Sequence, residues 1–105
     1  MSRRISENKH FLFLLYTTDT KQRKALLGSI TKEQLMSFCE LVLNIIKGVI
    51  PVSRETKNKL KRYARVLRLL AEKRSVSRGR KIALLLKHMR LVLMILRIGR
   101  KFFEE

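Results

Sequence analysis

Residues 57–81 read KNKLKRYARVLRLLAEKRSVSRGRK, and this segment combines an apolar helical face with a row of cations. The apolar residues recur at the spacing that buries one face of a helix: Leu60, Tyr63, Ala64, Leu67, Leu70 and Ala71. The cations fall together on another face: Lys57, Lys61, Arg65 and Arg68. Glu72 is the only acid between Glu55 and Glu104, and this sign bias counts against a merely solvated helix surface. The segment therefore predicts a folded helix that presents cations to a polyanion, of which nucleic acid is the commonest.

The composition of the whole chain agrees with this basic character. The 105 residues include 25 Lys and Arg against 8 Asp and Glu, which gives a formal net charge of +17. Hydrophobic residues make up 46%, too many for a disordered basic tail. We therefore predict one small folded domain over residues 1–105, stabilised by counterions, by a polyanionic partner or by self-association.

Helix start signals recur through the first half of the chain, whereas strand alternation is almost absent. Ser6 is a candidate cap for a first helix that runs through Phe11, Leu12, Leu14 and Leu15, although FLFLLY at 11–16 also fits a buried strand. Thr20 is a candidate cap for a second, short helix. Thr31 followed by Gln34 matches a capping box and predicts the start of a third helix.

The second half of the chain predicts two longer helices. Gly48 and Pro51 mark the end of the third helix, and Ser53 caps a fourth over residues 54–74. Serine and glycine among cations at 75–80 predict a basic flexible loop. The fold class is therefore all-α, a compact bundle of about five helices.

The last predicted helix, residues 80–99, is apolar on two faces. One stripe follows heptad spacing: Ile82, Leu85, Leu86, Met89, Val92, Leu93 and Leu96. The second stripe is a candidate oligomer or lipid face: Leu84, Leu91, Ile95 and Ile98. Such a helix either lies centrally in the domain or offers its second stripe to another copy of the chain; the small size of the chain favours the central position.

The N-terminus does not predict secretion. Residues 1–5 form a basic arm, but polar residues at 7–10 interrupt the approach to the apolar run, and no small-residue cleavage site follows it. The later apolar region, 82–98, carries four basic or histidine residues and is too short and too polar to span a membrane. The single cysteine, Cys39, excludes an internal disulfide and fits a core position.

Residues for catalysis are scarce. Asp19 is the only aspartate, and no two glutamates share a helical spacing that suits acid and base chemistry. His10 and His88 stand far apart without a cysteine or carboxylate pattern, so we predict no metal site and no cofactor. The four glycines form no phosphate-binding loop. The sequence therefore disfavours an enzyme.

Binding to phosphates is better supported. Successive turns of the basic helix advance by about 5.4 Å, and phosphates of one DNA strand repeat every 3.4 Å or so, hence alternate turns can meet phosphates without reading a base. We do not expect Tyr63 to stack on bases, because its spacing places it with the core. The candidate nucleic-acid-binding residues are Lys57, Lys59, Lys61, Arg62, Arg65, Arg68, Lys73, Arg74, Arg78, Arg80 and Lys81.

Four segments occur in a fixed order between residues 21 and 86: KQRKALL at 21–27, TKEQL at 31–35, CELVLNIIKGVIPVS at 39–53 and KNKLKRYARVLRLLAEKRSVS at 57–77. Together they resemble a family of short basic proteins of adintovirus or polinton-type elements, which are adenovirus-like elements and viruses of animal genomes. The resemblance implies a virion core or genome-packaging role, because the family's basic end is similar to the adenovirus core peptide. In that family a lysine-rich segment ending in a glycine pair follows the SVS position, whereas residues 78–105 replace it here. This departure favours a structural or oligomerising C-terminal helix over a processed core peptide.

The leading hypothesis is a viral, nucleic-acid-binding basic protein of the nucleus or virion, which contacts phosphates without sequence choice; DNA is the expected partner rather than RNA, although the basic pattern alone separates the two only weakly. One alternative is a membrane-active or capsid-associated helical protein whose last helix enters an anionic membrane surface. Another is a helical protein-interaction adaptor with a groove for a partner helix, in which the charge selects an acidic ligand.

Overall fold

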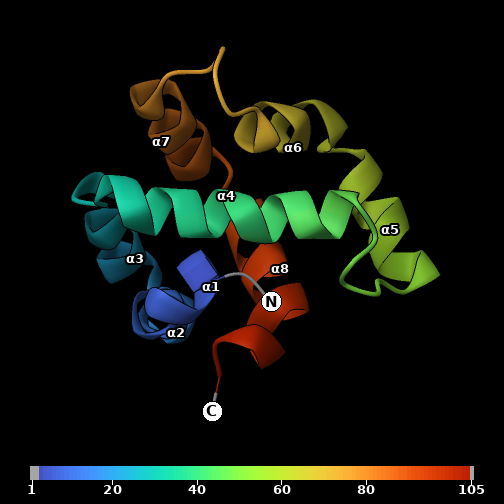
Figure 1. Ribbon diagram of the computed structural model, residues 1–105, viewed down its shortest axis with the longest axis horizontal. Coiled ribbons are helices and arrows are strands. Elements are labelled where there is room, and N and C mark those ends of the chain that lie inside the picture. The colour runs from blue at the N-terminus through green and yellow to red at the C-terminus, as the bar shows by residue number, and fades with distance from the viewer. Residues whose placement is uncertain (1–2, 105) are drawn as a thin grey trace.

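Eight α-helices and one short 3-10 helix make up residues 3–104, the part of the chain that the computed structural model describes (Figure 1). No strand occurs in this range, so the all-α class is confirmed, whereas the expected number of about five helices is wrong. The helices are α1 (Arg3–Glu7), α2 (Lys9–Thr17), α3 (Thr20–Gly28), α4 (Lys32–Ile46), α5 (Arg54–Lys61), α6 (Ala64–Ala71), α7 (Arg78–Lys87), α8 (Met89–Gly99) and η1 (Arg100–Phe102).

Helix α4 crosses the middle of the molecule and contacts α1, α2, α6, α7 and α8 (Figure 1). Its start is the expected capping box: the Gln34 backbone N–H donates to the Thr31 hydroxyl (3.1 Å), and the Gln34 side chain accepts from the Thr31 N–H (3.0 Å). Phe38, Leu41 and Val42 are completely buried. The helix ends before Gly48, whose φ of 76° is a left-handed conformation that glycine adopts without steric cost.

The segment predicted as one helix over residues 54–74 is two helices. Ser53 caps α5 as expected, accepting from the Thr56 N–H at 3.2 Å. The helix stops after Lys61, and Tyr63, with φ −107° and ψ 16°, precedes α6. A straight helix of 21 residues would be about 31 Å long. That length would nearly equal the longest extent of the molecule, 33 Å, so the break keeps both halves against the core.

The predicted long last helix is also divided. It begins at Arg78 and breaks at His88, whose φ and ψ are −117° and 59°. The two breaks lie against each other, since the Tyr63 and His88 rings pack edge to face with centroids 6.0 Å apart. The change of direction at His88 lets neighbouring helices cover both apolar stripes of the sequence, which a straight helix would not allow.

The N-terminal segment is helical rather than an arm. Within α1, Ile5 is 1% exposed, so the expectation of a free basic arm over residues 1–5 is wrong for residues 3–5; residues 1–2 lie outside the described part. The first predicted helix is divided at Asn8, whose side-chain amide donates to the Arg4 carbonyl at 2.8 Å. The cap of α3 is Asp19 rather than Thr20, and it accepts from the Gln22 N–H at 2.8 Å.

The basic loop predicted at 75–80 lies three residues earlier in the structure. Ser77 caps α7 by accepting from the Arg80 N–H at 3.2 Å, so residues 78–80 belong to a helix. The irregular segment covers 72–77, and within it Val76 is buried. An apolar anchor therefore fixes the middle of this loop.

Candidate nucleic-acid interface

Ten of the eleven candidate cations are exposed on α5, α6, the 72–77 loop and the first turn of α7: Lys57, Lys59, Lys61, Arg62, Arg65, Arg68, Lys73, Arg74, Arg78 and Arg80. We call these ten residues the basic surface. Each of its helices is oriented by apolar side chains that enter the core, among them Leu60 on α5, Leu67 on α6 and Leu85 on α7. The opposite faces therefore point outward, as amphipathic spacing dictates.

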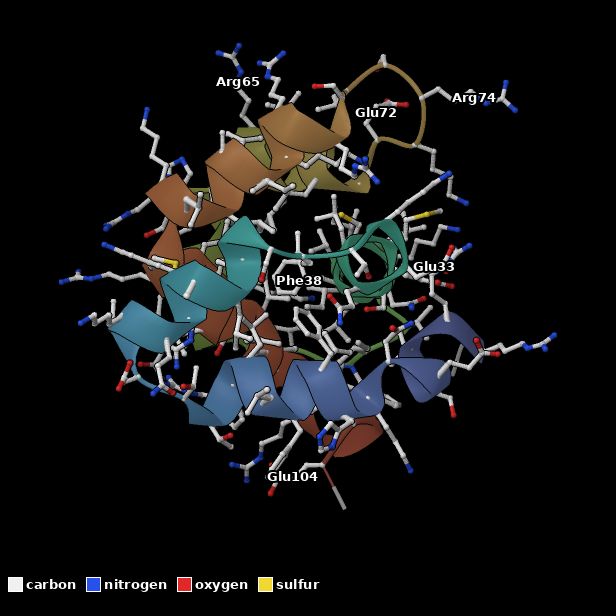
Figure 2. The ribbon with its side chains drawn as sticks, turned by 90° about the vertical axis from the view of Figure 1, so that its left-hand side faces the viewer. Glu33, Phe38, Arg65, Glu72, Arg74 and Glu104 are labelled. Atoms are coloured by element: carbon white, nitrogen blue, oxygen red, sulfur yellow. The ribbon has the colours of Figure 1, made fainter. Side chains whose placement is uncertain are left out.

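The basic surface is bent rather than straight. The break at Arg62 and Tyr63 separates the α5 cations from those of α6, so the straight row expected from Lys57 to Arg68 is wrong. In Figure 1, α5 lies along one side of the molecule and α6 runs across its top. Arg65 and Arg74 extend away from the body along that top edge (Figure 2). The cations consequently cover two adjoining faces, which suits a curved or wrapped polyanion better than a straight one.

Few carboxylates neutralise this region. Residues 54–81 include twelve Lys and Arg but only Glu55 and Glu72. Among residues 3–104, the one ion pair that involves the basic surface is Lys59 to Glu55, with Nζ and Oε1 3.9 Å apart and both side chains mostly exposed. Such a pair contributes little. Most of the other ion pairs of the described chain lie on α1 and near the C-terminus, so the positive potential over α5 to α7 is largely uncompensated.

The first turn of α7 adds a second source of positive potential. It carries Arg78 and Arg80 and no acid, although a helix N-terminus disfavours cations. A phosphate at this end would be attracted by the two guanidinium groups and by the free backbone N–H groups of the first turn. The first turn of α7 can therefore contribute to phosphate binding as one part of the basic surface.

Lys81 does not belong to the basic surface. It is 9% exposed, and its Nζ donates to the Glu72 backbone carbonyl, which follows the end of α6. The bond ties the start of α7 to the end of α6 and closes the 72–77 loop. From the sequence, Lys81 is predicted to be one of the phosphate-binding cations. Its contact with the Glu72 carbonyl forms only in the folded chain, so no sequence pattern indicates it.

The candidate oligomer or lipid face is mostly part of the core. Leu91 and Ile95 are at most 1% exposed, and Leu84 and Ile98 are half-buried. At Leu91 and Ile95 the structure therefore agrees with a central position of the last helix rather than a stripe offered to another copy of the chain. Other residues of the same chain cover these two side chains. No helix within residues 3–104 is long and apolar enough to cross a membrane.

An open groove of about 650 Å³ lies beside the basic surface and was not expected from the sequence. Its floor is apolar: Leu35, Met36, Cys39 and Leu43 from α4, with Leu70 and Ala71 from α6. Cations surround it: Arg4, Lys32, Lys73, Arg78 and Lys81. Since these residues come from α1, α4, the loop and α7, only the tertiary structure brings them together. Burial raises the pKa of the Cys39 thiol from 9.0 to about 11, an effect that the nearby Lys81 charge partly opposes.

In the described chain, no three His, Cys, Asp or Glu side chains lie close enough together to hold a metal ion. His88 packs against Tyr63 at the helix breaks, and both residues are half-buried. Comparison of the chain with protein-family models, with curated proteins and with solved structures found no match.

Proposed function

We propose that this protein binds nucleic acid through its phosphates, without sequence choice, and that it compacts or packages duplex DNA in a nucleus or virion. The observation that carries the proposal is the basic surface, ten exposed cations with two nearby glutamates. Phosphate contacts of this kind supply affinity without reading bases. The proposal includes no catalytic step.

The fold gives this surface a rigid support. The cations of α5, α6 and α7 stand on helices whose other faces are buried, so their backbone positions are fixed before a ligand arrives. Long lysine and arginine side chains then adapt to irregular phosphate positions, as a non-specific contact requires. A charge of +17 on a small domain also favours binding to DNA and its compaction, because the bound polyanion relieves the repulsion between the cations of the protein.

The salt dependence of binding tests this proposal. We expect retention on random duplex DNA to fall steeply as salt rises, with each neutralised phosphate contributing about 0.9 to the negative slope of log affinity against log salt. Unrelated DNA sequences should give the same affinity and the same slope. A flat salt dependence, or strong preference for one sequence, would contradict phosphate binding as the dominant contact.

A parallel measurement on duplex RNA of the same length tests the preference for DNA. The deep, narrow major groove and closer phosphate spacing of A-form RNA present a different surface to the bent patch. We expect DNA to bind more tightly at equal salt. Equal or tighter binding of RNA would reverse that part of the proposal.

A further inference from the structure

The groove follows three turns of α4. Its α4 residues run from Lys32 to Leu43 at three- and four-residue steps, so the floor extends for about 16 Å along the helix. Helix α1 borders the groove on one side, through Arg4. The end of α6 and the 72–77 loop border it on the other side, through Ala71 and Lys73. Figure 1 shows this outward side of α4 between α1 below and α6 and α7 above.

Charge around the groove is strongly biased. Arg4 is partly neutralised, with its Nε 3.3 Å from Glu33 and its Nη1 3.7 Å from Glu40, and Lys81 is bound to the Glu72 carbonyl. The remaining cations, Lys32, Lys73 and Arg78, are exposed and have no ion pair with any residue of 3–104. Because Lys32 borders one end of the α4 stripe and Lys73 and Arg78 belong to the border formed by the loop and α7, an acidic ligand can be held at two places along the groove.

Glu40 is the one acid among the described residues that line the groove. Its buried Oε2 atom accepts no hydrogen bond from the described residues but lies 3.7 Å from Arg4 Nη1. The Glu40 side chain is 27% exposed, so its carboxylate can still accept a hydrogen bond from a ligand donor. Glu40 also repels carboxylates from the middle of the groove, so the acids of a ligand must lie at its edges.

The shape of the groove indicates the class of ligand. Pockets for small molecules usually enclose about 70–90% of the ligand surface. This groove is open to solvent along one side, and a bound acyl chain would leave apolar surface in water. An amphipathic helix fits better, because it buries one apolar stripe and keeps its polar face in solvent. Met36 in the floor adapts readily to different apolar side chains.

We propose that this groove binds an amphipathic α-helix of a partner protein, with apolar residues at i, i+3 or i+4, and i+7 against the floor. Acidic side chains of the partner helix meet Lys32 at one end of the apolar stripe and Lys73 with Arg78 along its border. One central donor of the partner helix reaches Glu40. This interaction does not depend on the proposed nucleic-acid binding, although Lys73 and Arg78 belong to both surfaces.

A fluorescent peptide tests this docking site. The probe is a synthetic amphipathic helix of about 18 residues, roughly five turns, with a leucine stripe, glutamates on both flanks and one central glutamine. A scrambled peptide of identical composition controls for attraction by net charge alone. By fluorescence anisotropy, we expect the amphipathic peptide to bind at least about tenfold more tightly than the scrambled one. Equal affinity for the two peptides would overturn the proposal.

Matched variants locate the binding. Met36→Gln and Leu43→Gln change the half-buried floor and should remove the preference for the amphipathic peptide. Leu14→Gln changes an exposed leucine of α2 outside the groove and should keep it. All three variants should bind duplex DNA as tightly as the parent does. A failure of the peptide-binding proposal is therefore distinguishable from a failure of the DNA-binding proposal. An unchanged preference in folded Met36→Gln and Leu43→Gln would exclude the groove.

Alkylation of Cys39 provides a test on the unaltered chain. This is the single cysteine of the sequence, and it lines the floor. The amphipathic peptide should slow its reaction with iodoacetamide several-fold, and the scrambled peptide should not. Absence of protection by the amphipathic peptide would overturn the proposal. Protection only by a single-chain alkyl phosphate, supplied below its micelle concentration, would overturn it in favour of a lipid.

Discussion

Arg23 is a cation that serves the fold rather than a ligand. It is 4% exposed, and its guanidinium donates to the carbonyls of Leu15 (2.8 Å), Tyr16 (3.2 Å) and Thr18. These carbonyls lie in the last turn of α2 and just beyond it, where backbone acceptors lack intrahelical partners. The arginine of α3 thereby closes the end of α2.

Replacing Arg23 by alanine should therefore destabilise the protein. The change leaves these carbonyls without their donors. We expect the unfolding free energy to fall by about 1.5–3 kcal/mol, the range for a hydrogen bond with a charged group. Urea unfolding measures the loss. Lys24→Ala, one position away and exposed, should stay within about 0.5 kcal/mol of the parent. Equal effects of the two changes would show that the Arg23 bonds contribute nothing.

The Cys39 thiol should titrate at unusually high pH. Burial raises its pKa from 9.0 to about 11, so the rate of alkylation should rise with a midpoint near the higher value. In urea the midpoint should return to the ordinary value. Because the folded state holds the proton more tightly, its stabilising effect is complete below pH 9 and is lost as pH rises towards about 11. Cys39→Ser should remove this alkaline component, as measured by the difference between the two unfolding curves across that window.

Among the helices, the start and end signals were the most predictable features. Ser53 and the Thr31 capping box act through neighbours three residues away, so a local pattern contains all that is needed. The breaks at Tyr63 and His88 had no such signal, since neither glycine nor proline stands there. They arise from packing against the core and against each other, which a local pattern does not encode.

Helix α8 reaches its place through a close contact with α4. A Cβ at Gly99 would lie 2.5 Å from Leu41 Cδ1, and the Leu41 side chain is completely buried, so it would have to shift within the core. Gly99→Ala should therefore destabilise the fold by about 1–3 kcal/mol in thermal or urea unfolding. Gly79→Ala is the matched control within α7, where a Cβ meets nothing within 4 Å. It should be neutral or stabilising, because alanine favours a helix. A neutral Gly99→Ala would contradict the close packing of α8 on α4.

For the molecule as a whole, the sequence predicted the sign and the approximate location of the charged surface but not its shape. Composition and spacing are sufficient to place exposed cations on α5 to α7. The groove joins Arg4 and Lys32 to Lys73, which are far apart along the chain, so no sequence window contains it. Lys81 shows the same limit, since an internal lysine and a surface lysine look alike before the chain folds.

The central claim is that the basic surface, rather than net charge alone, binds DNA. The most direct test compares two triple charge reversals with equal net charge. One carries Lys61→Glu, Arg65→Glu and Arg68→Glu on the basic surface; the other carries Lys21→Glu, Lys24→Glu and Lys47→Glu, all exposed elsewhere. With both variants folded by circular dichroism, we expect the first to weaken retention of every duplex sequence at least about tenfold more than the second. Equal weakening by the two variants would contradict a defined interface on α5 to α7.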